Sequence, residues 1–261
     1  RLSSPTDLAL GVGMCSKALR PLTTVGATTY SFPNTDATGF PRPLPPARKI
    51  GLGRRALAGL QPSKKLPEGA SSAKFESSLE RDFFVLLEFN ADVISWEPQP
   101  VRLEVGPGSY VPDVLVTFAT ESRQLEDARS VLYEVKFRDE LKEKWAALKP
   151  RLQAGRRYAR EQGWRFRTIT EREIRTPLLW NAKFLLPYRE DGAPDADCER
   201  LLRLLDSLGE ATPRDLLSAA AQDRWEQARL LSVLWYLVAS RLIATDLTQR
   251  VTMTSRIWSH E

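Results

Sequence analysis

Residues 110–118 read YVPDVLVTF and residues 130–137 read SVLYEVKF, and these two stretches are the most informative part of the sequence. Both are rich in β-branched and aromatic residues, so we expect two strands joined by a polar loop. Side chains alternate between the two faces of a strand, so Glu134 and Lys136 point the same way. We therefore expect Asp113, Glu134 and Lys136 to meet at one end of a hairpin.

Two carboxylates beside an amine can hold a hard divalent cation and orient a water molecule for attack on a phosphodiester. The pattern alone is common, because an acid two residues before a lysine occurs in many strand edges. The competing interpretation is a surface hairpin with an ordinary ion pair.

A carboxylate in the preceding helix, expected over about residues 76–89, favours a metal site. The apolar stripe of this helix consists of Leu79, Phe83, Leu86 and Leu87. Glu80 borders or faces that stripe, and a carboxylate aimed inward is costly unless it is paired or bound to metal. The alternative is an ion pair between Glu80 and an arginine or lysine. The residues expected on the solvent side are Glu76, Arg81, Asp82 and Glu88.

Composition excludes several kinds of chemistry. The only histidine is His260, which argues against a Ser-His-Asp triad, a Cys-His dyad, an HNH-type site and histidine-bound zinc. The two cysteines, Cys15 and Cys198, lie far apart and suggest no disulfide framework, which fits a cytoplasmic setting. No run reaches the roughly 18 apolar residues that span a membrane, and no signal peptide is expected.

Positive charge is concentrated near the start of the chain. Residues 1–75 carry 11 Lys and Arg against 3 Asp and Glu, whereas the rest of the chain is slightly acidic. Residues 1–45 are expected to form a disordered or extended tail, and 46–74 a basic arm that follows a phosphate backbone. The arm residues assigned to DNA binding are Arg48, Lys49, Arg54, Arg55, Lys64 and Lys65. The alternative is a solvated arm without a ligand.

The expected elements give a mixed α/β core followed by a mostly helical region. After the helix over 76–89, we expect strands over 93–97, 100–105, 110–118 and 130–137, and a helix over 139–148. Pro150 is expected to start a second helix or to kink the first, with helix running to residue 163, and a strand follows over 164–170. Helices follow over 171–175 and 178–188, and a polar linker over 189–196. Three helices and a hairpin of 243–247 with 250–257 then predict a winged helix over 197–261. Its longest helix, about 224–240, is apolar on several sides, so this domain is expected to bind protein, with weak DNA contact as the alternative.

The chain resembles the TnsA family, the endonuclease subunits of heteromeric cut-and-paste transposases, over about residues 45–260. The resemblance rests on PARKI at 46–50, GRR at 53–55, QPSK at 61–64, FESSLERDF at 75–83, EPQP at 97–100, PDVLV at 112–116, YEVK at 133–136, RRY at 156–158 and TEREI at 170–174. It implies a restriction-endonuclease-like core of the PD-(D/E)xK type over 75–190.

The resemblance also implies roles for individual residues. Glu80, Asp113 and Glu134, with the Val135 carbonyl, would bind Mg²⁺, for which Mn²⁺ can substitute, in a site for two ions. Lys136 would orient the attacking water and stabilise negative charge. The enzyme would cut double-stranded DNA at the 5′ ends of the transposon, beside a DDE transposase that cuts the 3′ ends. An AAA+ ATPase regulator would contact the C-terminal domain.

Two other functions fit the same residues. One is a stand-alone restriction or junction-resolving nuclease, which would cut DNA without partners. The other is a catalytically silent DNA-bridging adaptor, which would bind no metal at this site.

Overall fold

The computed structural model describes residues 58–119 and 129–259, all of which belong to one compact unit, Pro43–Glu261. Several sequence-based expectations therefore lie outside the described residues: the tail over 1–45, Arg48, Lys49, Arg54, Arg55 and His260.

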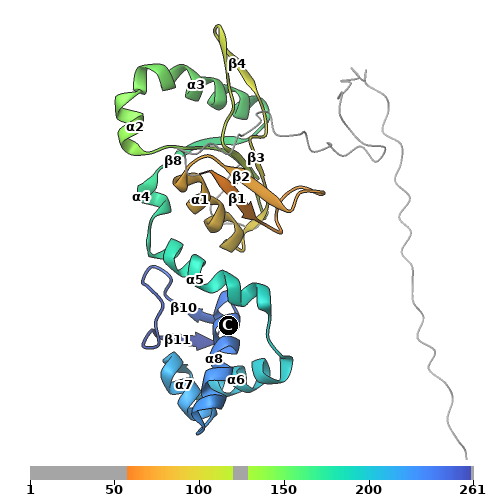
Figure 1. Ribbon diagram of the computed structural model, residues 1–261, viewed down its shortest axis with the longest axis vertical. Coiled ribbons are helices and arrows are strands. Elements are labelled where there is room, and N and C mark those ends of the chain that lie inside the picture. Colours follow the sequence, from red (N-terminus) through yellow and green to blue (C-terminus); the bar gives the residue numbers. More distant parts are fainter. Residues whose placement is uncertain (1–57, 120–128, 260–261) are drawn as a thin grey trace, which may run out of the picture. The chain divides into compact units, whose positions relative to one another are not determined.

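A four-stranded mixed sheet forms the core that the sequence predicts (Figure 1). Its strands lie in the order β3 (Val93–Pro98), β6 (Val114–Phe118), β7 (Ser130–Val135) and β8 (Arg165–Ile169). β6 pairs antiparallel with both β3 and β7, whereas β8 pairs parallel with β7 after a helical crossover. Alternate residues of β6 are buried, which is the period-two pattern of a strand with one covered face.

Helix α1 (Ser78–Phe89) packs on the sheet through aromatic contacts. The ring of Phe84 lies 4.6 Å from that of Trp96 on β3, centroid to centroid. The ring of Phe83 lies 5.1 Å from that of Tyr133 on β7. These contacts place α1 beside the strands that carry the motif residues.

Two acids of α1 that the sequence places on the solvent side are buried: Asp82 and Glu88 are each 3 % exposed. The reason is a second covering layer, because α4 (Glu171–Ile174) and α5 (Pro177–Asp191) also pack on α1. A single apolar stripe therefore does not describe the buried surface of this helix. Each acid is paired: Asp82 with Arg81, Arg175 and Lys183, and Glu88 with Arg189.

The chain between β3 and β6 differs from the expectation. The strand expected over 100–105 and the start of the one expected over 110–118 form a separate hairpin, β4 (Leu103–Val105) with β5 (Gly108–Tyr110). Pro112 has no backbone N–H to donate to a ladder, and β6 begins only after it, at Val114.

The helix expected over 139–148 is two helices, α2 (Arg138–Glu143) and α3 (Trp145–Glu161). The break falls at Lys144, where φ is −107°. Pro150 lies inside α3 and neither ends nor begins a helix. α3 packs against β7 and β8 through a buried face that includes Leu148 and Leu152.

Part of the expected basic arm is a two-stranded hairpin, β1 (Gly59–Pro62) with β2 (Ser72–Phe75). Gly59 faces Phe75 so closely that a Cβ at position 59 would lie 2.6 Å from the Phe75 ring. Lys64 is exposed. The Lys65 amine instead donates to the carbonyl oxygens of Leu87 and Asn90, at the end of α1.

The C-terminal part contains α6 (Asp195–Leu208), β9 (Glu210–Ala211), α7 (Pro213–Ala220), α8 (Arg224–Ala239), β10 (Ile243–Thr245) and β11 (Ile257–Ser259). β11 pairs antiparallel with both β10 and β9, so the second strand of the expected hairpin begins later than the sequence suggests. α8 lies in the core of this part, as its apolar sequence predicts. Within 58–119 and 129–259, no helix is long and apolar enough to cross a membrane.

Helix α5 extends into the expected linker over 189–196 as far as Asp191, and α6 begins at Asp195, which leaves only residues 192–194 between them. It packs against α1 on one side and α8 on the other (Figure 1). Its side chains join the same hydrophobic cluster as Leu230 and Leu234 of α8 and Val85 and Phe89 of α1.

Candidate active site

The motif residues meet at the ends of β6 and β7, as the alternation of side chains predicts. Asp113 precedes β6, and its Oδ2 accepts a hydrogen bond of 2.7 Å from the backbone N–H of Val135. Lys136 follows β7, and its Nζ lies 2.8 Å from Glu134 Oε1 and 3.3 Å from Asp113 Oδ2. The same amine donates to the Val135 carbonyl oxygen at 3.1 Å. One ammonium group thus contacts two carboxylates and a carbonyl.

Glu134 is the buried member of this group, with 3 % of its surface exposed. Burial raises the pKa of the Glu134 carboxyl to about 7, the neighbouring Asp113 carboxylate adds to the rise, and Lys136 opposes it. Burial lowers the pKa of Lys136, but the two carboxylates outweigh this effect and raise it above its usual value. Lys136 therefore remains an ammonium ion at neutral pH.

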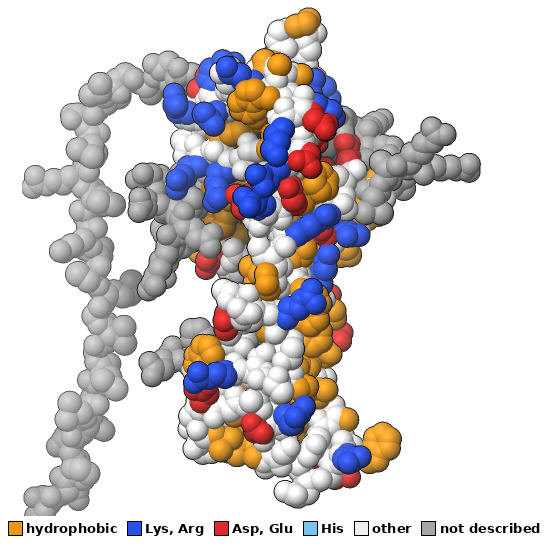
Figure 2. All heavy atoms as spheres, turned by 90° about the vertical axis from the view of Figure 1, so that its left-hand side faces the viewer, with side chains coloured by type: hydrophobic (Ala, Val, Ile, Leu, Met, Phe, Trp, Pro, Cys, Tyr) orange, Lys and Arg blue, Asp and Glu red, His pale blue; other side chains and the backbone are white. Residues whose placement is uncertain are grey.

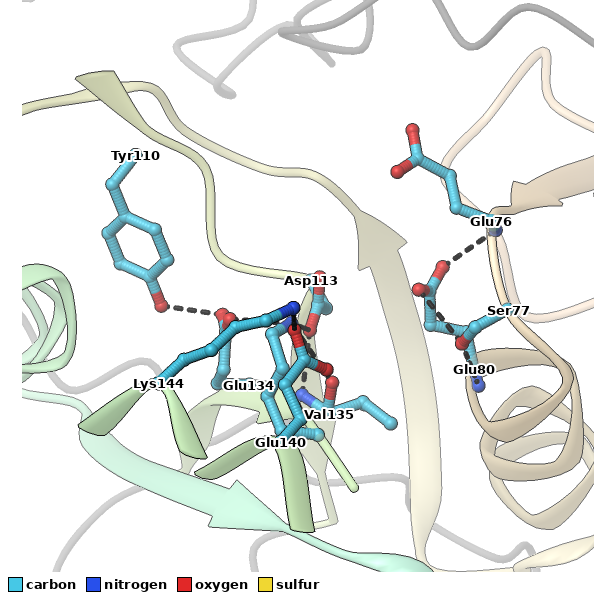
Figure 3. A network of polar contacts seen from close by, with 10 residues as sticks. Glu76, Ser77, Glu80, Tyr110, Asp113, Glu134, Val135, Glu140 and Lys144 are labelled. Atoms are coloured by element: carbon cyan, nitrogen blue, oxygen red, sulfur yellow. Dashed lines mark hydrogen bonds and ion pairs between the residues drawn. The ribbon is translucent and has the colours of Figure 1, made fainter. Parts of the chain in front are cut away.

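Tyr110 also contacts Glu134, although the sequence did not predict it as a site residue. Its hydroxyl donates a 2.6 Å hydrogen bond to Glu134 Oε2 (Figure 3). Burial raises the pKa of Tyr110 far above its usual value, and the charge of Glu134 raises it further, so the hydroxyl keeps its proton. One oxygen of Glu134 is thus held by Tyr110 and the other by Lys136. No local pattern in the sequence marks this contact, because it depends on the β4–β5 hairpin.

Glu80 lines the same pocket and takes part in the first turn of α1. Ser77 is the N-cap, and its hydroxyl accepts a hydrogen bond of 3.1 Å from the Glu80 backbone N–H. The Glu80 carboxylate accepts hydrogen bonds of 2.9 Å from the Glu76 N–H and 3.1 Å from the Ser77 hydroxyl. A carboxylate at the third helical position commonly caps a helix in this way. The inward orientation of Glu80 that the sequence predicts can thus be explained by helix capping as well as by metal binding.

The donor set suits a hard divalent cation. Oxygens of Asp113, Glu134 and Val135 already surround one positive charge, the Lys136 ammonium. Carboxylate and carbonyl oxygens are the ligands that Mg²⁺ prefers. Within the described part of the chain, no three carboxylates lie close enough together to form a complete metal cluster. Glu80 as a third carboxylate ligand therefore stays a prediction.

These residues line a pocket with a cavity of about 360 Å³. Its acids are Glu76, Glu80, Asp113, Glu134 and Glu140, and its cations are Arg102, Lys136, Lys144 and Arg151. The mixture of signs suits a ligand that carries negative charge and is bound together with a metal ion.

Two elements supply the cations other than Lys136. Arg102 lies just before β4, and its Nη1 donates a 2.8 Å hydrogen bond to the hydroxyl of Ser109 in β5. Lys144 and Arg151 are seven residues apart, or about two helical turns, so the start of α3 presents both to the pocket. Figure 2 views the side that carries α2, α3 and α4 and shows many Lys and Arg side chains gathered there.

Comparison with protein families decides the relationship. Residues 90–171 match a family described as TnsA-like endonuclease N terminal, and residues 173–247 match one described as TnsA endonuclease C terminal. The chain belongs to the TnsA family. It therefore has a restriction-endonuclease-like core and is a DNA endonuclease subunit of a Tn7-like transposase. No curated protein matches the chain.

The two TnsA matches cover some of the candidate site residues but not all of them. The N-terminal match spans β3 to β8 and includes Asp113, Glu134 and Lys136. It begins after α1, so it does not cover Glu80. The C-terminal match begins at residue 173 and includes α5.

Proposed function

We propose that this TnsA-family protein hydrolyses a DNA phosphodiester at the pocket of Asp113, Glu134 and Lys136, and that the reaction requires Mg²⁺. One observation carries the proposal: oxygens of Asp113, Glu134 and Val135 lie within hydrogen-bonding distance of one cationic group, the Lys136 ammonium. Oxygens that surround an ammonium group can also bind a metal cation in its place, whereas apolar side chains cannot bind either cation.

The proposed role of each residue follows from its charge. Asp113, Glu134 and the Val135 carbonyl would hold Mg²⁺, with Glu80 as a further ligand and room for a second ion. When bound, the metal would supply an activated water and neutralise charge on the phosphoryl group. Lys136 stays protonated, so it donates hydrogen bonds and stabilises negative charge, but it does not accept the proton of water.

The cations of the pocket support a phosphodiester substrate. Arg102, Lys144 and Arg151 line the cavity together with the acids. Arginine and lysine side chains neutralise DNA phosphates, which supplies much of the affinity of DNA-binding proteins. We also propose that the arm residues Arg48, Lys49, Arg54, Arg55 and Lys64 contact the DNA backbone. Lys65 already donates to the end of α1, so it contributes charge there rather than a free side chain.

We further propose that the protein cuts the 5′ ends of a transposon beside a DDE transposase. The order α6, β9, α7, α8, β10 and β11, with β11 between β10 and β9, supports a winged helix for the C-terminal part. Its longest helix is buried in its own core, and residues 196–261 carry 8 basic against 9 acidic residues. This charge balance favours a protein partner, such as the AAA+ regulator, over DNA.

The test uses the full chain, its partner transposase and a duplex that carries a transposon end, in Mg²⁺. We expect a nick at the 5′ end of the element, and a loss of at least about 100-fold in rate for Asp113→Ala. Equal cleavage by wild type and Asp113→Ala contradicts the proposal. Efficient cutting by the wild-type chain alone would favour a stand-alone nuclease instead.

A further inference from the structure

Gln99 has an unusual backbone for its residue type. Its φ is +51°, and within the described ranges only Arg241 among the non-glycine residues is also in the left-handed region. This conformation brings Cβ close to the backbone and costs energy. Such a residue persists only where the surrounding structure fixes it, and these residues gather at functional sites.

The neighbours of Gln99 fix this conformation. It lies between two prolines, Pro98 at the end of β3 and Pro100, and a following proline disfavours the right-handed helical region for the residue before it. Its backbone N–H donates a 2.9 Å hydrogen bond to the carbonyl oxygen of Asp113. Gln99 is therefore tied to the residue that supplies one of the two motif carboxylates.

The side chain of Gln99 carries a second anomaly. Its amide oxygen, Oε1, is buried and has no hydrogen-bond partner among the described residues, a property it shares only with Trp96 Nε1. Burying an unsatisfied acceptor is unfavourable, so such an atom needs an explanation. Because Gln99 also lines the pocket of Asp113 and Glu134, the explanation lies in what that pocket binds.

The chemistry of the pocket limits which group can contact Gln99 Oε1. A carbonyl oxygen accepts a hydrogen bond or binds a hard metal ion, and carboxylates and a DNA phosphodiester offer no donor. Three of the four cations of the pocket have acceptors of their own: Lys136 donates to the motif carboxylates, Lys144 to Glu140, and Arg102 to Ser109. Water is the donor that hydrolysis itself must bring to this pocket.

We propose that Gln99 is a positioning residue that orients the attacking water by accepting a hydrogen bond from it at Oε1. The inference rests on the proposed DNA hydrolysis at the same site. The amide orients an O–H bond and takes no proton. It complements Lys136, whose amine donates hydrogen bonds at the same site.

Three variants of the full chain test this role: Gln99→Met, which keeps the length of the side chain but removes the carbonyl, Gln99→Glu, which restores an acceptor, and Gln99→Gly. We expect Gln99→Met to lower kcat by about 100-fold with KM for DNA and Mn²⁺ affinity unchanged. Gln99→Glu should recover part of the rate. Gln99→Gly should lower kcat as much as Gln99→Met does, while its Tm holds or rises because glycine tolerates the positive φ.

Each other outcome identifies a different role and overturns the proposal. A fall in Mn²⁺ affinity in Gln99→Met would make Gln99 a metal ligand, and a rise in KM alone would make it a DNA contact. A lower Tm with unchanged kcat would make it structural. Arg241→Gly is the control, because it relieves the other left-handed residue, far from the motif in sequence, and should leave kcat unchanged. A wild-type chain that cuts no DNA overturns the proposed function as well, whereas an active Gln99→Met overturns only the role of Gln99.

Discussion

The Lys136 ammonium lies 2.8 Å from Glu134 Oε1 and 3.3 Å from Asp113 Oδ2, so one cation contacts both motif carboxylates. The same oxygens are the ones that a divalent cation would use. The ammonium and the metal therefore compete for one set of ligands, and Lys136 must move away from at least one of them when the metal binds.

This competition predicts the effect of removing the amine. We expect Lys136→Met to keep or raise the affinity for Mn²⁺, measured by titration calorimetry, while it lowers the cleavage rate by at least about 100-fold. Lys142→Met is the control, because Lys142 is exposed on α2 and outside the pocket. If Lys136→Met bound Mn²⁺ much more weakly than wild type, the amine would support the metal site rather than compete with it.

A second prediction concerns pH. Metal binding needs an ionised Glu134, whose pKa is raised to about 7 by burial. Below that pH, Mn²⁺ affinity should fall by up to about tenfold per pH unit. Without metal, stability depends on pH in the opposite direction. Folding favours the protonated form of Glu134, so the free energy of unfolding decreases as pH rises from 4.5 to about 7. Glu134→Gln should remove both dependences, and a wild-type affinity that is flat between pH 5 and pH 8 would contradict this prediction.

Tyr110 should act through Glu134. Its hydrogen bond of 2.6 Å fixes Glu134 Oε2 and favours the ionised carboxylate. We expect Tyr110→Phe to weaken Mn²⁺ binding about 10-fold at neutral pH and to shift the pH profile of binding upward. Tyr188→Phe, on α5 and outside the pocket, should change neither quantity. An unshifted profile in Tyr110→Phe would show that the hydroxyl only fills space.

The cations of α3 make a prediction about DNA. Arg151 lines the pocket, whereas Arg160 of the same helix is nine residues away and so points about 180° from it. We expect Arg151→Gln to weaken DNA binding and to reduce the slope of log affinity against log salt by about 0.9. Binding is measured by fluorescence anisotropy in Ca²⁺. If Arg160→Gln had the same effect, net charge rather than position would explain it.

Asp82 tests the packing of α1 on α5. Its carboxylate pairs with Lys183 at 2.6 Å and Arg175 at 3.0 Å. Burial would raise its pKa, but these partners and Arg81 outweigh burial and lower it, so the stabilisation is present above pH 3.8 and is lost at lower pH. We expect Asp82→Asn to lower the free energy of unfolding by about 1–3 kcal/mol in chemical denaturation at pH 7. Asp139→Asn, with an 88 % exposed side chain, should change it by less than about 0.5 kcal/mol.

The sequence was most informative where periodicity and chemistry agree. The alternation in SVLYEVKF correctly placed Glu134 and Lys136 together. The mixed sheet and the apolar α8 also followed from local pattern. These features depend on residues near one another in sequence, and such interactions are the ones that propensity and patterning describe.

The features that the sequence did not predict depend on contacts between segments far apart in the chain. Asp82 and Glu88 are buried because α5, about 100 residues later, covers α1. Lys65 points to the end of α1 because hairpin β1–β2 folds back on that helix. The role of Tyr110 required the β4–β5 hairpin to bring the ring over Glu134, 24 residues away. No local pattern in the sequence encodes these contacts.

The most direct test of the metal site is Mn²⁺ binding to the full chain, measured by titration calorimetry for wild type, Asp113→Ala and Glu140→Ala. Both acids line the pocket, but only Asp113 shares Lys136 with Glu134. We expect wild type and Glu140→Ala to bind Mn²⁺ alike, and Asp113→Ala to bind at least about 10-fold more weakly. Equal affinity in wild type and Asp113→Ala, or no binding to wild type at all, would contradict a metal site at Asp113 and Glu134.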